Sequence, residues 1–339
     1  MRAAQRKDVN GRKIGKMYKE FADYWISHAN SESLKYVSFE KVDLSKEYWN
    51  RVFEPALEVW SHGQTPNPDI SEIKFGALLD SLNLEDGWIA TGHYARLDRT
   101  ESPFSDTTHN HENRVRLHRG VDPVKDQSYW LSSVSEAHFR KALFPIGHLT
   151  KRDVRRLATE AGLPTASRKE SMGICFVGRR RSFSSFLDGY LSPNPGPIIT
   201  LDGVAIALHQ GLWHYTIGQN ARISGQPKRM FVAEKRPDRN ELVVVDDPRH
   251  PAMSRSSILV TNFQWIWREH PPPESFREEG MDVGVKFRSV MQPVPSVLHM
   301  RNHSEGEIFF KDKQYGIAAG QIAVAYMDSW CLGGGRIEE

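Results

Sequence analysis

The first part of the chain alternates between two patterns of apolar residues. Between Val37 and about Asp188, short apolar runs alternate with segments in which apolar residues recur at helical spacing. This alternation is typical of α/β architecture. The run from Gly87 to Gly92 predicts a buried strand that ends at a glycine. We therefore expect an α/β domain in this part of the chain.

A basic amphipathic helix is predicted from Thr150 to Gly162. Thr150 can cap the helix with Asp153 three residues later, and Gly162 followed by Pro164 can end it. The apolar stripe consists of Val154, Leu157, Ala158 and Ala161, and the outer face carries Lys151, Arg152, Arg155 and Arg156. A solvated helix face and a footprint for phosphate groups both fit this cluster of cations.

Short β-like runs dominate after the proline cluster at 192–197. They are separated by Gly, Asp and Pro, and include Ile198–Thr200, Leu242–Val245, Val283–Phe287 and Ile322–Tyr326. Such runs predict small β-sheets or a barrel. A second boundary is expected near Asp246–Pro251. The chain is therefore expected to have four parts. They are a targeting-like segment at 1–35, an α/β nucleotide domain at 36–190, a small central domain at 191–250 and a β-barrel at 251–339.

Composition narrows the classes of protein. The 339 residues suggest two or three domains, and no apolar run approaches the ~18 residues needed to cross a bilayer. We expect neither an integral membrane protein nor a membrane partner. Two cysteines cannot form a disulfide framework, and no Cys/His spacing predicts a metal site. The net charge of +3 neither requires nor excludes nucleic acid.

The two cysteines have different surroundings. Cys175 lies between Gly173 and Gly178 and precedes the three arginines at 179–181, an electropositive setting that lowers a thiol pKa. From these residues alone, a buried inert cysteine remains an alternative. Cys331 lies in a glycine-rich turn, and we interpret it as structural.

Four motifs occur in a fixed order along the chain. They are Thr65–Ile70 (TPNPDI), Ala90–Tyr94 (ATGHY), Lys125–Tyr129 (KDQSY) and Lys169–Phe176 (KESMGICF). Together with Tyr215–Gln219 and Cys331–Gly335, this ordered set resembles the tRNA 2-thiouridylase family, whose members place sulfur on the wobble uridine of certain tRNAs. The resemblance implies a Rossmann-like ATPase domain of the PP-loop type, a small central domain and a carboxy-terminal β-barrel.

The resemblance also assigns roles to the first three motifs. Two prolines hold the TPNPDI segment extended, and from these residues alone an ordinary Asx turn without a binding role remains an alternative. The resemblance implies that Asn67, Pro68 and Asp69 lie against the target base, with Asp69 also catalytic. A glycine at a strand end lets a flat adenine approach, and the resemblance implies that Gly92 lines an ATP site. The implied tRNA contacts are Lys125, Asp126, Gln127 and Arg288. Tyr129 and Trp130 are expected in the core.

In such enzymes the cysteine that corresponds to Cys175 carries a persulfide. ATP first adenylates the uracil C2 oxygen, the outer sulfur then attacks, and a second thiol releases the sulfur by forming a disulfide. The resemblance therefore implies ATP as co-substrate, tRNA and a persulfide sulfur-donor protein as partners, and no metal. The basic residues of 1–35 and the residues of the Lys169–Cys175 motif, which resemble eukaryotic members, favour a mitochondrial location. A bacterial cytoplasm is expected if the source is not eukaryotic.

The sequence departs from the family pattern at two places. It contains no Ser-Gly-Gly-x-Asp-Ser loop, which would hold the phosphates of ATP, and Ser71 follows Ile70 without the segment that carries the first catalytic cysteine. We therefore expect a truncated nucleotide domain and a chain that is inactive as it stands. A tRNA-binding remnant without catalysis is the alternative, and an unrelated ATP-dependent ligase is disfavoured.

Overall fold

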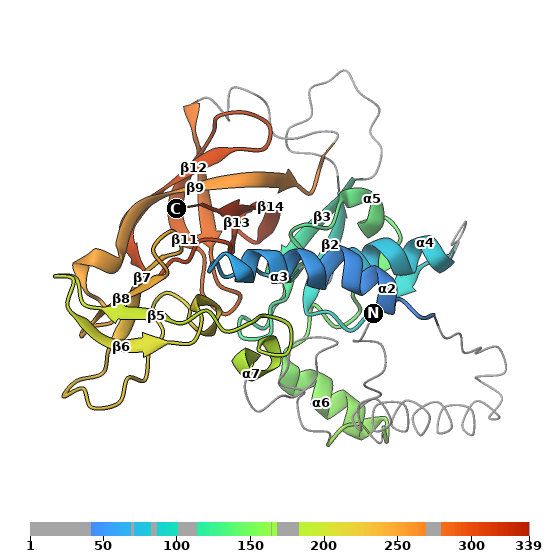
Figure 1. The fold of residues 1–339 in the computed structure, drawn as a ribbon. Helices are drawn as coiled ribbons and strands as arrows, with labels where there is room; N and C mark the ends of the chain where they lie inside the picture. The colour runs from blue at the N-terminus through green and yellow to red at the C-terminus, as the bar shows by residue number, and fades with distance from the viewer. Residues whose placement is uncertain are drawn as a thin grey trace. The chain divides into compact units, whose positions relative to one another are not determined.

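The computed structural model describes residues 42–68, 71–82, 87–100, 114–163, 165–167, 183–268 and 279–338. The chain divides into two compact units, Met1–Asp43 and Leu44–Glu339. All elements below belong to the second unit (Figure 1). Among the described residues, no helix is long and apolar enough to cross a membrane.

Short helical segments open the second unit. They are α2 (Ser45–Tyr48), η3 (Trp49–Phe53), α3 (Glu54–Ser61), η4 (Glu72–Ala77) and α4 (Leu78–Leu82). Helix α3 has a proline in its first turn, where no backbone donor is lost, and it buries Ala56 and Trp60. These side chains share a small core with Phe53, with Leu187 at the end of α7 (Phe183–Leu187), and with Trp213 of η6 (Leu212–His214).

The strand expected at 87–92 forms, but it is short and not buried. Strand β1 (Ile89–Ala90) pairs in parallel with β4 (Ala142–Leu143). Ile89 is half-buried and Ala90 is exposed. The preceding Trp88 is 54% exposed and is covered by the guanidinium of Arg99 at 4.8 Å from the ring centroid. The expected burial was wrong because the described part of the chain supplies one partner strand instead of a wide sheet.

Helix α6 (Lys151–Glu160) confirms the predicted caps. The hydroxyl of Thr150 accepts a hydrogen bond from the Asp153 backbone at 3.2 Å, and Gly162 ends the helix with φ 66°. No residue of α6 is buried, and Leu157 is 42% exposed. Within the described part of the chain, the apolar stripe therefore has no core to pack against.

The predicted β-like runs all lie in strands. The middle sheet contains β5 (Gly196–Ile199), β6 (Ala205–His209), β7 (Phe231–Arg236) and β8 (Glu241–Val245) in the order β6-β5-β8-β7. Its core includes Ile198, Val232 and Leu242. Each of these three side chains belongs to a different strand, so the alternating apolar positions of the sequence face one core.

A closed six-stranded barrel follows. Its strands are β9 (Ser254–Trp265), β10 (Met281–Lys286), β11 (Val294–Met300), β12 (Gly306–Tyr315), β13 (Ile322–Met327) and β14 (Trp330–Ile337). The β13–β14 pairing closes the order β13-β10-β11-β12-β9-β14. A hairpin from the first part, β2 (Ala95–Thr100) and β3 (Arg114–Arg119), continues the sheet because β3 pairs with β14. Residues 101–113, which connect these two strands, lie outside the described residues.

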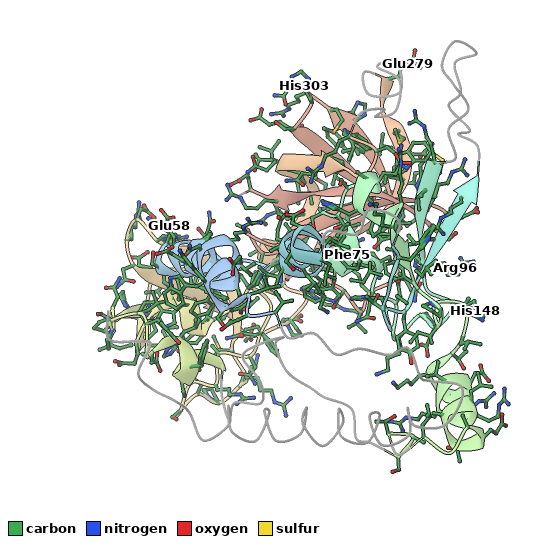
Figure 2. All side chains as sticks on the ribbon, turned by 90° about the vertical axis from the view of Figure 1, so that its right-hand side faces the viewer. Glu58, Phe75, Arg96, His148, Glu279 and His303 are labelled. Atoms are coloured by element: carbon green, nitrogen blue, oxygen red, sulfur yellow. The ribbon has the colours of Figure 1, made fainter. Side chains whose placement is uncertain are left out.

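The largest core joins the barrel to the first part of the chain. Phe75 of η4, which Figure 2 labels, makes edge-on contacts with Phe139 of α5 (Glu136–Phe139) and with Phe144. These rings belong to one buried cluster with the barrel side chains. The segments before and after β1 are thereby held against the barrel.

Candidate functional site

The segment that carries Asn67 is fixed from two sides. The backbone N–H of Thr65 donates to Ala319 O at 3.1 Å in the turn before β13. The buried ammonium of Lys235, on β7, donates to Gly63 O at 2.7 Å and to Thr65 Oγ1 at 3.2 Å. Gly320 has φ 87°, and a Cβ there would meet Thr65 O at 3.0 Å. The middle sheet and the barrel therefore both position this segment.

Asn67 itself begins a short chain of hydrogen bonds. Its amide donates to the hydroxyl of Tyr129 at 3.4 Å, and this hydroxyl donates to Ile322 O at 2.9 Å. Burial raises the pKa of Tyr129, against the smaller opposing effects of these bonds and of the charge of Arg288. The phenol therefore stays protonated and can hold the carboxamide in place. Asp69 lies outside the described residues.

A cavity of about 440 Å³ opens beside Asn67 and Pro68. Its size is within the range of sites for small organic ligands. The other walls come from Pro55 of α3, from η5 (Ser128–Leu131), from the turn after η5 and from three barrel strands. Besides Pro55, their residues are Tyr129, Trp130, Ser132, Ser133, Asn262, Gln264, Ile322, Gly334, Gly335 and Arg336. The expectation of a core position is confirmed for Tyr129 and wrong for Trp130, which is 46% exposed.

Gly92 lies just after the carboxyl end of β1. It is exposed, and a Cβ placed there would meet only Ile146 Cδ1, at 3.8 Å. The next residue, His93, packs between the rings of Phe75 and Phe144, and its Nδ1 is 2.6 Å from Thr91 Oγ1. Burial, with a contribution from Lys74, lowers the pKa of His93 to about 4. The His93 ring is therefore neutral at pH 7.

Asp126 is buried at the centre of a charged network. Its carboxylate accepts from Lys286 Nζ at 3.0 Å, and both side chains are 0% exposed. Arg119 Nε lies at 3.4 Å, and the backbone N–H groups of Gly120 and Ser128 also donate to it. Burial acts to raise the pKa of Asp126, but Lys286 and these bonds lower it overall. This burial argues against direct contact between the Asp126 side chain and tRNA.

The other predicted tRNA contacts are nearer to the surface. Gln127 is half-buried, and its Oε1 accepts from the Tyr94 N–H at 2.9 Å, which leaves its NH₂ group as a donor. Lys125 is half-buried in the preceding turn, and its N–H donates to Asp122. Arg288 is exposed and donates to Gly316 O. Its charge also acts on Tyr129, so Arg288 and Asn67 influence the same hydroxyl.

Cys331 cannot act as an exposed thiol. It is 0% exposed, and burial, followed by the charge of Asp126, raises its pKa far above the ordinary value. This burial agrees with a structural role, but the expected glycine-rich turn was wrong, because Cys331 and the glycines after it lie in strand β14. Cys175 lies outside the described residues. Within the described ranges, no cluster of three or more His, Cys, Asp or Glu side chains could hold a metal ion.

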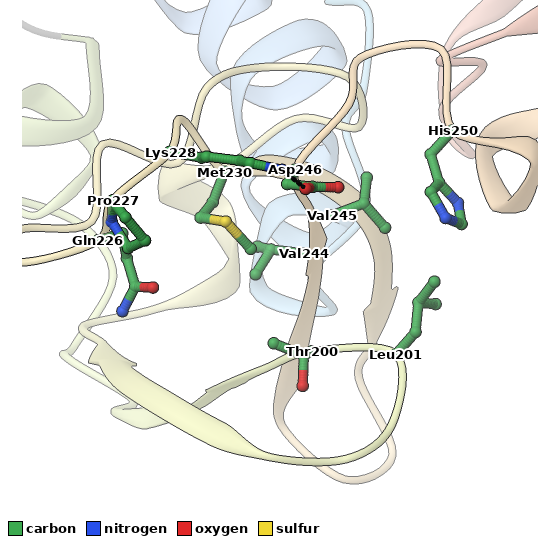
Figure 3. A pocket seen from close by; sticks show the side chains of 10 residues that line it. All are labelled: Thr200, Leu201, Gln226, Pro227, Lys228, Met230, Val244, Val245, Asp246 and His250. Atoms are coloured by element: carbon green, nitrogen blue, oxygen red, sulfur yellow. Dashed lines mark hydrogen bonds and ion pairs between the residues drawn. The ribbon is translucent and has the colours of Figure 1, made fainter.

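A second hollow, of about 390 Å³, lies on the middle sheet (Figure 3). Its polar groups are the ion pair between Lys228 and Asp246, 2.7 Å apart, with Thr200, Gln226 and His250 around it. None of the residues predicted from the motifs lines it. The cavity at Asn67 is therefore the better candidate site.

Two important residues were not predicted from the sequence. Lys286 is fully buried and Lys235 nearly so, although lysine is rarely buried without a partner. The available signal was a lysine inside each apolar β run, at Val283–Phe287 and at Phe231–Arg236. Their partners are 160 and 172 residues away, so no local pattern could identify them.

Comparison with known proteins supplies the context for this geometry. Three family models match, described as tRNA methyl transferase HUP domain at 22–179, tRNA methyl transferase PRC-barrel domain at 184–246 and Aminomethyltransferase beta-barrel domain at 255–337. Their order agrees with the expected α/β plus β architecture.

Similar proteins come from several bacteria and are named tRNA-specific 2-thiouridylases. The relative from Idiomarina loihiensis is 37% identical over 316 residues, which cover 89% of this chain and 80% of the relative. The relative from Nitrosomonas europaea is 40% identical over 311 residues, covering 89% and 81%. One from Geobacillus kaustophilus is 37% identical over 319 residues, covering 92% and 80%.

Proposed function

Because the chain belongs to the family of tRNA-specific 2-thiouridylases, we propose that it acts in the thiolation of uridine in tRNA. The observation that supports this most is the position of Asn67 and Pro68, held by the middle sheet and the barrel at the edge of a cavity. A segment that is held rigidly from two sides can present its side chains to a single base. Asn67, Pro68 and Asp69 are the proposed contacts to the target base, with Asp69 also catalytic.

The proposed sulfur carrier is Cys175, as a persulfide loaded by a donor protein. Its outer sulfur attacks C2 of the uridine after ATP has adenylated the C2 oxygen, and AMP leaves. A second thiol then attacks the Cys175 sulfur, which forms a disulfide and leaves the transferred sulfur on the base. Since Cys331 is buried, this second thiol has to come from another molecule.

The proposed ATP site lies around Gly92, where a flat ring can approach the backbone. The sequence contains no Ser-Gly-Gly-x-Asp-Ser loop to hold the phosphates, so we expect this chain to be inactive in adenylation. A mitochondrial location is part of the proposal. It rests on the polar insertion at 100–113 and on the Lys169–Cys175 motif, which resemble eukaryotic family members, and the basic residues in 1–35 add weaker support.

The proposed tRNA surface combines helix α6 with the turn before η5. Lys151, Arg152 and Arg155 lie on α6, and the backbone N–H of Lys151 donates to Asp122 at 2.9 Å, which joins the helix to the turn that carries Lys125. Gln127 and Arg288 complete the proposed contacts. Asp126 positions this turn through Lys286 and is the one predicted contact that we reassign.

Binding of tRNA should therefore depend steeply on salt. Each phosphate neutralised contributes roughly 0.7 to 0.9 to the slope of log K against log salt concentration. Replacing Lys151, Arg152 and Arg155 together by glutamine should reduce that slope by about 2 to 3. The measurement is tRNA affinity by fluorescence anisotropy over a range of salt concentrations.

The matched control removes the same number of charges elsewhere. Arg229, Arg239 and Arg249 are exposed residues around the middle sheet, and their replacement by glutamine should leave the slope nearly unchanged. Equal slopes for the two triple variants and the unchanged chain would rule out α6 as the tRNA surface.

The second candidate is a protein that binds tRNA without catalysis. It is favoured by the burial of Cys331, because this burial leaves no second accessible thiol in this sequence. Affinity for tRNA does not separate the two candidates. Transfer of labelled sulfur to tRNA, with a persulfide donor, ATP and an added thiol, would support the enzyme. Because adenylation is expected to fail without the phosphate-binding loop, the deciding result for this chain is the loading of labelled sulfur on Cys175: loading supports the enzyme, and its absence supports the remnant.

A further inference from the structure

Trp130 is exposed in a place where its neighbours are buried. Tyr129 and Leu131 are 4% and 2% exposed, whereas the indole of Trp130 is 46% exposed at the cavity beside Asn67. The other strongly exposed indole among the described residues, Trp88, is covered by Arg99. No cation among the described residues covers Trp130, so one face of an aromatic ring is available to a ligand.

The indole is also held rigidly. It packs edge-on against Tyr129, with ring centroids 5.3 Å apart and an interplanar angle of 89°. Its backbone N–H donates to Gln127 O at 3.1 Å, and its carbonyl accepts from Ser71 Oγ at 2.6 Å. A ring fixed in this way loses little conformational entropy when a ligand stacks on it.

Two carboxamide side chains line the same cavity as this ring. Asn262 is exposed, and its side chain has no hydrogen-bond partner in the described part of the chain. Gln264 accepts from Arg268 Nη2 at 2.7 Å through Oε1, which leaves its NH₂ group available. Exposed amides beside an aromatic platform match the way proteins read unstacked bases in RNA loops.

The described lining contains no group that could transfer sulfur. It includes no cysteine or acidic side chain, Tyr129 is protonated, and Arg336 is paired with Glu338 through Nε at 3.0 Å and Nη2 at 2.9 Å. The lining can therefore recognise a ligand but offers no means to react with it.

We propose that this cavity binds an unmodified base of the tRNA loop next to the target uridine, stacked on Trp130 and read by Asn262 and Gln264. This inference rests on the proposed function, because it requires a tRNA substrate. The base is bound while its neighbour reacts at Cys175. The cavity thereby makes recognition depend on the nucleotide beside the target as well as on the target itself.

The test uses a tRNA with a wobble uridine, in which 2-aminopurine replaces one loop base at a time. Stacking on the indole should quench the probe at one position flanking the target. Stacking contributes ~1–3 kcal/mol per base, so Trp130→Ala should weaken binding about 5- to 150-fold and abolish the quenching. Trp130→Phe should retain most of both, which separates stacking from a folding defect.

Trp88→Ala is the matched control, because it removes an indole of similar exposure that lies outside the cavity. It should change neither affinity nor quenching. Tight binding by Trp130→Ala with unchanged quenching would overturn the subsite and leave the proposed function intact. Failure of the unchanged chain to bind tRNA at all would instead refute the proposed function, and the subsite with it.

Discussion

Replacing Lys286 with methionine is expected to destabilise the chain by about 3–5 kcal/mol, because it leaves the buried carboxylate of Asp126 without its main counter-charge. The two side chains are fully buried, Arg119 Nε lies farther from the carboxylate, at 3.4 Å, and the backbone donors of Gly120 and Ser128 carry no net charge. The measurement is the free energy of unfolding from urea denaturation.

Two further variants make this prediction specific. Lys286→Met combined with Asp126→Asn should recover part of the loss, because no buried charge is then left unpaired. Lys311→Met breaks the exposed pair with Asp282 on the same barrel, where the side chains are 57% and 79% exposed, and should cost no more than about 1 kcal/mol. A loss at Lys286 as small as that at Lys311 would contradict the account.

The pH dependence has a definite sign. The pKa of Asp126 is lowered in the folded chain, so its contribution to stability is present above the unfolded pKa and is lost as the pH falls through the folded pKa. The acid-induced loss of stability should therefore be smaller in Asp126→Asn than in the unchanged chain.

ATP is expected to bind this chain about two to six decades more weakly than it binds a family member with the Ser-Gly-Gly-x-Asp-Ser loop. In the proposed site the exposed backbone at Gly92 would contact only the adenine ring, whereas three phosphates need several convergent amides or cations. Charge-assisted bonds of this kind contribute ~1.5–3 kcal/mol each, so lacking two or three costs about 3–9 kcal/mol.

Calorimetric titration of ATP and of adenosine tests this directly. If only the adenine is recognised, the two ligands should bind with similar, weak affinities. A family member that contains the loop serves as the positive control. Micromolar binding of ATP, with much weaker binding of adenosine, would show that other residues of this chain hold the phosphates.

The elements predicted correctly from the sequence are those with local causes. Thr150 and Gly162 cap and end α6 through residues three or four positions away, and the short apolar runs form strands because alternation alone indicates the buried face. Even there, the sequence did not show that Leu157 is exposed, since exposure depends on what packs against the helix.

The features that were missed depend on residues distant in the chain. Asp126 was expected to contact tRNA because the family resemblance implies it, yet its side chain is buried against Lys286, which lies 160 residues away. Trp130 was expected in the core together with Tyr129, but it lines a cavity that is built from segments between Pro55 and Arg336. Tertiary packing decided both cases.

The most direct test of the account is to load the chain with a persulfide donor and map the added sulfur by mass spectrometry. We predict that it resides on Cys175, is absent from Cys175→Ser and persists in Cys331→Ala, because Cys331 is buried and its pKa is raised. Added sulfur on Cys331, with Cys175 unmodified, would contradict the account.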